Sequence, residues 1–260
     1  MLLDAVGAIH EPVAGQARIV CLVPSITELI CDLGLAEQLV GRTGFCIHPW
    51  ETVRGIPKVG GTKDVLLDRI RELAPTHVIV NVDENRRETA QALEAFVPHV
   101  VVTHPQAPHD NLPLYRLLGG IFGREEEAER LVAEFERACA AATATPRPRR
   151  DVLYLIWRDP WMTVSPETYI SRTLELFNWH TLPRECASRY PEIELGEFVG
   201  AVDHVLLSSE PYHFHDEHLA EVVAAMDGAK VSLIDGEMTS WYGSRAIRGL
   251  EYLDAYTRSG

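Results

Sequence analysis

The chain has 260 residues, and 46% of them are hydrophobic, which is ordinary for a protein with a globular core. It carries 24 Lys and Arg against 38 Asp and Glu, a formal net charge of −14. Nucleic-acid binding relies on clustered Lys and Arg, so this charge argues against a nucleic-acid partner. No apolar run approaches the ~18 residues of a membrane span, so no membrane insertion is expected.

The first 15 residues, MLLDAVGAIHEPVAG, contain neither the basic region nor the sustained apolar region of a secretory signal. As written, the protein is therefore expected in the cytoplasm. A sequence trimmed of its leader would look similar, and the expected location would then be periplasmic or extracytoplasmic. The five cysteines are an odd number without a CxxC spacing, which predicts reduced thiols.

Short apolar runs alternate with amphipathic segments in the first half of the chain. Residues 18–23 (RIVCLV) predict a strand, and residues 26–35 predict a helix. Ser25 stands three residues before Glu28, which fits a capping box at the start of this helix. A strand that leads into a helix N-terminus can present backbone N–H groups to a ligand. Further strands are predicted over residues 40–43, 77–82 and 100–103, and a further helix over residues 65–73.

The segment after the second predicted strand, residues 44–64, is long, irregular and rich in Gly and Pro. Such loops in compact domains are often functional. Cys46 and His48 are close enough in sequence to share one metal ion, although core packing explains a thiol and an imidazole equally well. Trp50 follows them as a candidate ligand contact.

The strand predicted over residues 77–82 ends in the polar sequence Asp-Glu-Asn-Arg. In open parallel sheets, ligands bind beyond the carboxyl ends of the strands. Glu84, Asn85 and Arg86 are therefore candidate ligand-binding residues. The alternative is that Asp83 and Asn85 cap the next helix.

The middle of the chain predicts one long helix. Its residues lack Gly and Pro, repeat apolar side chains at helical spacing and end before Pro146 and Pro148, which gives a length of roughly 30 Å. The basic run that follows, residues 147–150, is interpreted as a solvated linker. The predicted organisation is an N-terminal α/β lobe over residues 1–123, an inter-lobe backbone helix over residues 124–145 and a C-terminal α/β lobe over residues 146–260.

The second lobe opens with a predicted strand over residues 151–157, and two Trp and one Arg stand within five residues at its end. Trp157, Arg158 and Trp161 would form a flat apolar wall with a cation, suited to a large planar or ring-bearing ligand. Core packing explains one of these Trp easily and two less well. Tyr169 begins the next predicted helix and is expected to face the same site.

Two later loops are rich in polar and aromatic side chains. The loop after the strand predicted over residues 204–209 contains Glu210, Tyr212, His213, His215 and His218. Imidazoles suit transition metals, although three surface histidines at a helix start explain the pattern without a metal. The loop after the last strand, residues 230–235, contributes Trp241, Tyr242 and Arg245.

These segments together resemble the helical-backbone metal receptor superfamily, the class III substrate-binding proteins that include vitamin B12, siderophore and haem binders of ABC importers. The resemblance runs from about Arg18 to the C-terminus and rests on residues 18–35, 56–80, 151–157 and 240–245, together with the long helix. It implies an α/β fold of two Rossmann-like lobes joined by a single backbone helix, the class III periplasmic-binding-protein fold.

The resemblance also implies a function. A protein of this kind binds a metal chelate in the cleft between its lobes, here a corrinoid such as cobalamin, another tetrapyrrole or a siderophore. No cofactor is certain, and the candidates for a bound group are a corrinoid, haem or a transition metal. The expected ligand-binding residues are Cys46, His48, Trp50, Glu84, Asn85, Arg86, Trp157, Arg158, Trp161, Tyr169, Glu210, Tyr212, Trp241, Tyr242 and Arg245.

The family docks onto arginines of an ABC permease through one acid on each lobe, and such a permease is the expected partner. Asp68 falls at the expected position of the first acid. Glu197 lies one residue from the position of the second, where this chain has Gly196. Thr62 stands where cobalamin binders carry an aromatic residue.

Two alternatives remain from the residues alone. One is a cytoplasmic binder of a bare transition-metal ion through Cys46, His48, His213 and His215 with nearby carboxylates. The other is an enzyme that uses Cys46 as nucleophile and His48 as base. The sequence contains no nucleophile elbow, P-loop or HExxH motif, so we expect a binding protein and not an enzyme.

Overall fold

The computed structural model describes residues 1–259, which divide into two compact units. Unit 1 comprises Met1–Pro105, His109–Phe135 and Tyr242–Arg245. Unit 2 comprises Gln106–Pro108, Glu136–Trp241 and the chain from Ala246 onward. Each unit contains one parallel sheet, and the predicted α/β fold class is confirmed.

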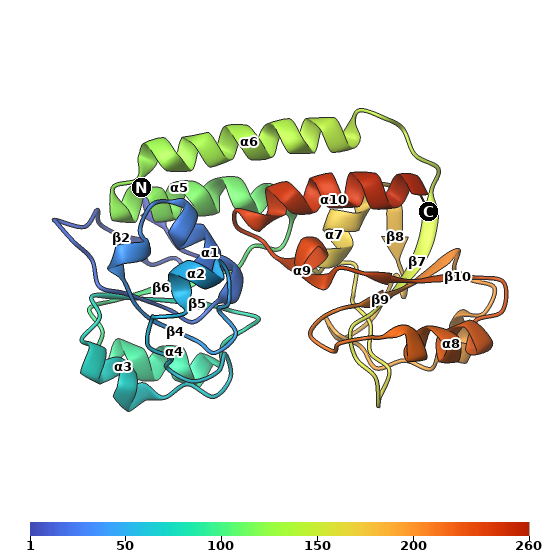
Figure 1. The fold of residues 1–260 in the computed structure, drawn as a ribbon, viewed down its shortest axis with the longest axis horizontal. Coiled ribbons are helices and arrows are strands. Elements are labelled where there is room, and N and C mark those ends of the chain that lie inside the picture. Colours follow the sequence, from blue (N-terminus) through green and yellow to red (C-terminus); the bar gives the residue numbers. More distant parts are fainter. Residues whose placement is uncertain (260) are drawn as a thin grey trace. The chain divides into compact units, whose positions relative to one another are not determined.

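Unit 1 is built on a four-stranded parallel sheet in the order β4-β3-β5-β6. Its strands are β3 (Ile19–Cys21), β4 (Leu39–Arg42), β5 (His77–Asn81) and β6 (His99–Thr103). Both faces of β5 are buried, as the apolar residues 78–80 at its centre predict for an interior parallel strand. The helices α3 (Leu67–Leu73) and α4 (Arg87–Glu94) lie on one side of the sheet, and α1 (Pro24–Asp32) and α5 (Asn111–Phe122) on the other (Figure 1).

Several short elements complete unit 1. A hairpin that the sequence did not predict joins β1 (Leu2–Leu3) to β2 (Ile9–His10). The hairpin covers the edge strand β6, because the Ala5 N–H donates to the carbonyl of Val102 and the Val102 N–H donates to Asp4 Oδ2, both at 3.0 Å. The remaining elements are α2 (Trp50–Val53), η1 (Ala36–Gln38) and η2 (Pro108–Asp110), the last of which lies at the boundary between the units.

Unit 2 repeats this architecture with a parallel sheet in the order β10-β9-β7-β8. Its strands are β7 (Arg150–Leu155), β8 (Trp179–Thr181), β9 (His204–Ser208) and β10 (Lys230–Ile234). Its helices are α7 (Tyr169–Glu175), α8 (Asp216–Ala225), α9 (Gly236–Ser240), α10 (Arg245–Ser259) and η3 (Leu195–Phe198). Apolar side chains of β7 and β9 pack against Val222 and Met226 at the end of α8.

The long helix of the chain is α6 (Glu125–Thr143), close to the predicted residues 124–145. Gly123 ends α5 in the left-handed conformation, with a φ of 63°, so that α6 can begin in a new direction. Residues of α6 up to Phe135 belong to unit 1, and those from Glu136 belong to unit 2. None of the described helices has the length and apolar character that crossing a bilayer requires.

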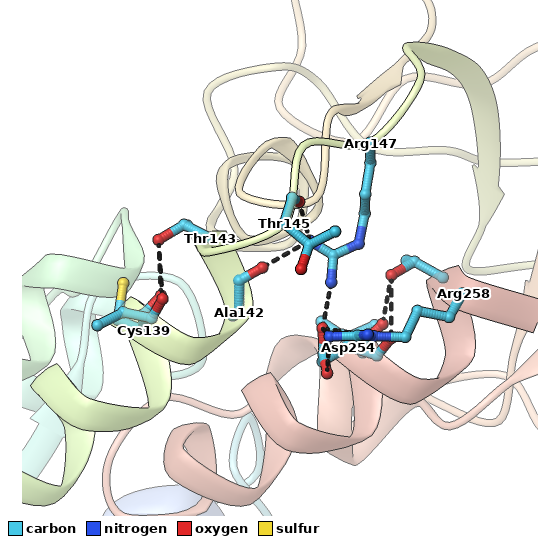
Figure 2. A network of polar contacts seen from close by, with 10 residues as sticks. Cys139, Ala142, Thr143, Thr145, Arg147, Asp254 and Arg258 are labelled. Carbon is cyan, nitrogen blue, oxygen red and sulfur yellow. Dashed lines mark hydrogen bonds and ion pairs between the residues drawn. The ribbon is translucent and has the colours of Figure 1, made fainter.

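The segment after α6 is not the solvated linker that its basic sequence suggested. The side chain of Arg147 is only 8% exposed, and its guanidinium donates to the carbonyls of Ala142 and Thr145 at the end of α6. Its second amino group forms an ion pair with Asp254 of α10, which Arg258 also contacts (Figure 2). Arg147 therefore joins the C-terminal end of α6, which belongs to unit 2, to α10.

Candidate functional site

In unit 1, the buried side-chain amide of Asn85 organises the loop that follows β5. Asn85 Oδ1 accepts a hydrogen bond from the backbone N–H of Asn81 at 2.8 Å, and Asn85 Nδ2 donates to the carbonyl of Thr62 at 2.9 Å. Asn85 is 6% exposed, so its amide shapes this loop from within. It does not cap α4, whose N-cap is Arg86 without a side-chain hydrogen bond, so the capping alternative is wrong.

The neighbouring residues of the same loop face different surroundings. Glu84 is half-buried and accepts a hydrogen bond from the hydroxyl of Tyr242. Burial and the adjacent carboxylate hold the pKa of Tyr242 well above its usual value. Arg86 is exposed and pairs with Asp64 at 3.2 Å, a surface contact that leaves the guanidinium near solvent.

Arg245, a predicted ligand contact, forms a buried ion pair with Glu28. Arg245 Nε lies 2.6 Å from Glu28 Oε2, and Arg245 Nη2 lies 3.1 Å from Glu28 Oε1. Both side chains are 6% exposed. The predicted capping box is also wrong, because Val23 is the N-cap of α1 and Glu28 points to Arg245 and not to the start of the helix.

Cys46 does not have the surroundings of a reactive thiol, which argues against the alternative of a Cys46 nucleophile. Cys46 is fully buried, and its Sγ lies 3.1 Å from the hydroxyl of Thr43. Burial raises the pKa of this thiol, whereas a reactive cysteine needs a lowered one. His48 is half-buried and Trp50 is 52% exposed. Within residues 1–259, no group of three or more Cys, His, Asp or Glu is arranged to hold a metal ion.

Unit 2 gathers aromatic rings beyond the carboxyl ends of β7 and β9. The Trp157 ring meets Tyr212 edge-on at 5.5 Å, Tyr212 lies 4.7 Å from Phe214, and Phe214 is parallel to Trp161 at 6.1 Å. Trp157 is 41% exposed, although exposing an indole to water is unfavourable. We call these four residues the aromatic wall. Sequence reasoning missed Phe214, which is buried behind the exposed rings.

The cation beside the aromatic wall is neutralised. Arg158 contacts both carboxylate oxygens of Glu221, each at 3.0 Å, and its guanidinium lies 5.8 Å from the centre of the Trp161 ring. Arg158 also pairs with Asp159 at 2.9 Å, so two carboxylates surround this one cation and the group at the side of the wall carries no net positive charge. Tyr169, expected at the same site, is 8% exposed and belongs to the buried part of α7.

Trp241 is held by a carboxylate and is not an open ring at a strand end. It follows α9, is 9% exposed, and donates its indole N–H to Glu210 Oε1 at 2.6 Å. The hydroxyl of Ser240 donates to the same oxygen at 3.0 Å. Burial raises the pKa of Glu210, and these two hydrogen bonds oppose the rise.

Three histidines gather at the start of α8. His218 lies at the third position of the helix and accepts the backbone N–H of His215 at 2.9 Å through Nδ1. The ring of His213 meets that of His215 at 4.4 Å. The alternative prediction was three surface histidines at a helix start. His215 and His218 do more than this, because they form a capping box, whereas His213 has no part in it.

The two predicted docking acids are both on the surface of their own units. Asp68 lies on α3 with a side chain that is 92% exposed, and it pairs with Arg71 at 2.8 Å. Glu197 is exposed in η3. A Cβ added to the neighbouring Gly196 would meet no atom within 4 Å, so this position also has room for a side chain.

Comparisons with known proteins find similarity to binding proteins. The family described as "Periplasmic binding protein" matches residues 19–176. The vitamin B12-binding protein of Photorhabdus laumondii subsp. laumondii is 22% identical over 189 residues, which cover 71% of this chain and 67% of that protein.

Solved structures share the fold over nearly the whole chain. The periplasmic haem-binding protein of Roseiflexus sp. RS-1 in its apo form has a TM-score of 0.78 at 22% identity, covering 94% of this chain and 99% of that one. The periplasmic vitamin B12 binding protein of Vibrio cholerae has a TM-score of 0.79 at 16% identity, covering 94% and 97%. At these identities, the likeness shows the fold alone.

Proposed function

Because this chain belongs to the periplasmic binding protein family, we propose that it is the substrate-binding protein of an ABC importer whose cargo is a metal chelate. It is a binding protein and not an enzyme, as the sequence predicted. We further propose that the chelate is a corrinoid or another tetrapyrrole. The relatives named above for vitamin B12 and haem support this choice.

The aromatic wall is the observation that carries the proposal. Large flat rings that remain partly exposed suit the face of a macrocycle, because aromatic surfaces gain by stacking and by excluding water. Trp157 offers such a ring at 41% exposure, supported from behind by Tyr212 and Phe214. Since the supporting rings are already packed against one another, binding would order few additional side chains.

The arginines favour a tetrapyrrole or corrinoid over an anionic siderophore. A siderophore with several carboxylates or catecholates needs accessible cations. Arg245 is engaged with Glu28 and Arg158 with Glu221, so two of the three arginines singled out from the sequence are neutralised within their own units. Of these three arginines, only Arg86 is exposed, and it forms a surface ion pair with Asp64.

The proposed role requires a location and a partner. An importer receives cargo from outside the cytoplasm, so we propose the periplasmic one of the two predicted locations. We propose Asp68 and Glu197 as the acids that meet a permease, because each is exposed on its unit and can approach a basic surface.

Substitution in the aromatic wall tests the proposal. Trp157→Ala removes the most exposed ring of the wall and is expected to weaken chelate binding by about tenfold or more, equivalent to about 1.4 kcal/mol. Val223→Ala is the matched control, because Val223 is 55% exposed on α8 but is not part of the wall. Equal affinity of the two variants for the chelate, measured by absorbance titration, would remove the wall from the binding site.

A further inference from the structure

Hydrogen bonds decide which nitrogen of each clustered histidine holds a proton. His218 Nδ1 accepts from the backbone N–H of His215, so the proton of neutral His218 is on Nε2, which lies 3.1 Å from the Tyr212 hydroxyl. The ring of His215 accepts from the backbone N–H of His218 in a reciprocal capping box. Both rings are therefore committed to the start of α8.

His213 is held in the opposite way. Its Nδ1 lies 3.0 Å from the carbonyl oxygen of Ser209, which can only accept a hydrogen bond. Nδ1 must therefore carry the proton, and Nε2 of the neutral ring carries the lone pair. Metal-binding histidines in proteins usually show this arrangement, in which one ring nitrogen donates to a carbonyl and the other binds the metal.

The surroundings of His213 suit a metal that arrives already chelated. His213 and His215 line a shallow hollow of about 440 Å³, together with Ser209, Phe214 and the acids Asp216 and Glu217. Phe214 also belongs to the aromatic wall. The described residues 1–259 provide no cluster of three or more metal ligands, but a macrocycle supplies its own four nitrogens and needs only an axial ligand from the protein.

We propose that His213 Nε2 is an axial ligand to the metal of the bound chelate, iron in a porphyrin or cobalt in a corrin. The inference rests on the proposed function and assigns a residue within it. The Nε2 lone pair forms the coordinate bond, and a weakly held axial water leaves as a neutral molecule. In the neutral ring the proton stays on Nδ1, so coordination through Nε2 releases no proton and transfers no electron.

The test is the spectrum of protein loaded with ferric haem and, separately, with diaquacobinamide. The wild type is expected to show imidazole-ligated bands with both probes. His213→Ala is expected to show water-ligated bands, and added imidazole should restore the original spectrum. His99→Asn is the matched control, because His99 is exposed at the start of β6 in unit 1 and does not line this hollow, and its spectrum should match that of the wild type. His215→Asn, in which Asn retains the helix-capping role, shows which of the two neighbouring histidines supplies the imidazole. Metal-free protoporphyrin IX should bind the wild type and His213→Ala equally.

The failure of this inference differs from failure of the proposed function. Binding of the metal probes with an unchanged spectrum in His213→Ala would overturn the role of His213 and leave chelate binding intact. Loss of the imidazole bands in His215→Asn but not in His213→Ala would also overturn it. No binding of any probe by the wild type would contradict the proposed function and this inference together.

Discussion

Glu28 and Arg245 form the most deeply buried ion pair among the contacts described above. A charge removed from water is costly unless its partner stays in place. Arg245→Met leaves the Glu28 carboxylate buried without its bidentate partner, so we expect the free energy of unfolding to fall by about 3–5 kcal/mol. Urea denaturation followed by circular dichroism measures this change.

A second substitution separates the ion pair from simple packing. The double variant Glu28→Leu with Arg245→Met replaces both charges with apolar groups, and it should recover most of the lost stability. A double variant as unstable as Arg245→Met alone would contradict the assignment of the loss to an unpaired charge.

The ion pair between Glu28 and Arg245 could not be predicted from the sequence, because the two residues are 217 positions apart along the chain. The sequence predicts ligand contact for Arg245, Arg158 and Trp241, and this stays a prediction. In the structure a carboxylate holds each of them. Without an observed partner, a cation or indole near a strand end looks the same whether it serves the ligand or the fold.

At the scale of elements, Arg147 connects the end of α6 to α10 (Figure 2). Arg147→Ala removes the ion pair with Asp254 and the bond to the Ala142 carbonyl in a largely buried setting. We expect it to lower the free energy of unfolding by about 2–4 kcal/mol. The same urea measurement applies.

Arg149→Ala provides the comparison for Arg147. Arg149 is 51% exposed and meets Asp151 only at 3.4 Å, so its removal should change stability by about 0.5 kcal/mol or less. If Arg147→Ala lowered the free energy of unfolding as little as Arg149→Ala, the segment after α6 would be a solvated linker and this account would be contradicted.

Most elements could be predicted because their apolar periodicity is strong. The seven predicted strands correspond to β3 to β7, β9 and β10, with each end within two residues of its predicted position, and α6 differs from its predicted range by one and two residues at its ends. The hairpin of β1 and β2 was missed because two-residue strands are too short to show alternation. Arg147 was missed because a basic run contains no sign of a distant acid.

On the scale of the whole molecule, each unit carries one buried histidine at the start of an interior strand, His77 in β5 and His204 in β9. The similar strand sequences HVIV and HVLL had suggested distant repeats. Burial, with His99 and His10 nearby, lowers the pKa of His77 to about 4. Burial, with Lys230 and Arg150 outweighing Asp203, lowers the pKa of His204 to about 4.

These two histidines predict acid sensitivity. Between pH 6.5 and about 4 the unfolded chain binds protons that the folded chain does not, so stability falls as the pH falls through this window. At pH 5 each histidine should cost about 2 kcal/mol relative to pH 7. His77→Gln and His204→Gln should each flatten the dependence of unfolding free energy on pH. Curves for both variants that run parallel to the wild-type curve would contradict this account.

The division into units was only partly visible in the sequence. The predicted C-terminal lobe included Tyr242–Arg245, but the structure groups this segment with unit 1. Two contacts explain the difference. The hydrogen bond to Glu84 attaches Tyr242 to the loop after β5, and the ion pair with Glu28 attaches Arg245 to α1. Local periodicity cannot reveal a short segment that crosses from one unit to the other.

The central claim is that the protein binds a tetrapyrrole or corrinoid. The most direct measurement is a titration of purified protein with cobalamin, cobinamide and haem, followed by tryptophan fluorescence and ligand absorbance. We predict saturable binding to at least one of them with a Kd of about 1 µM or tighter, equivalent to about −8 kcal/mol. No saturable binding to any of the three would contradict the claim.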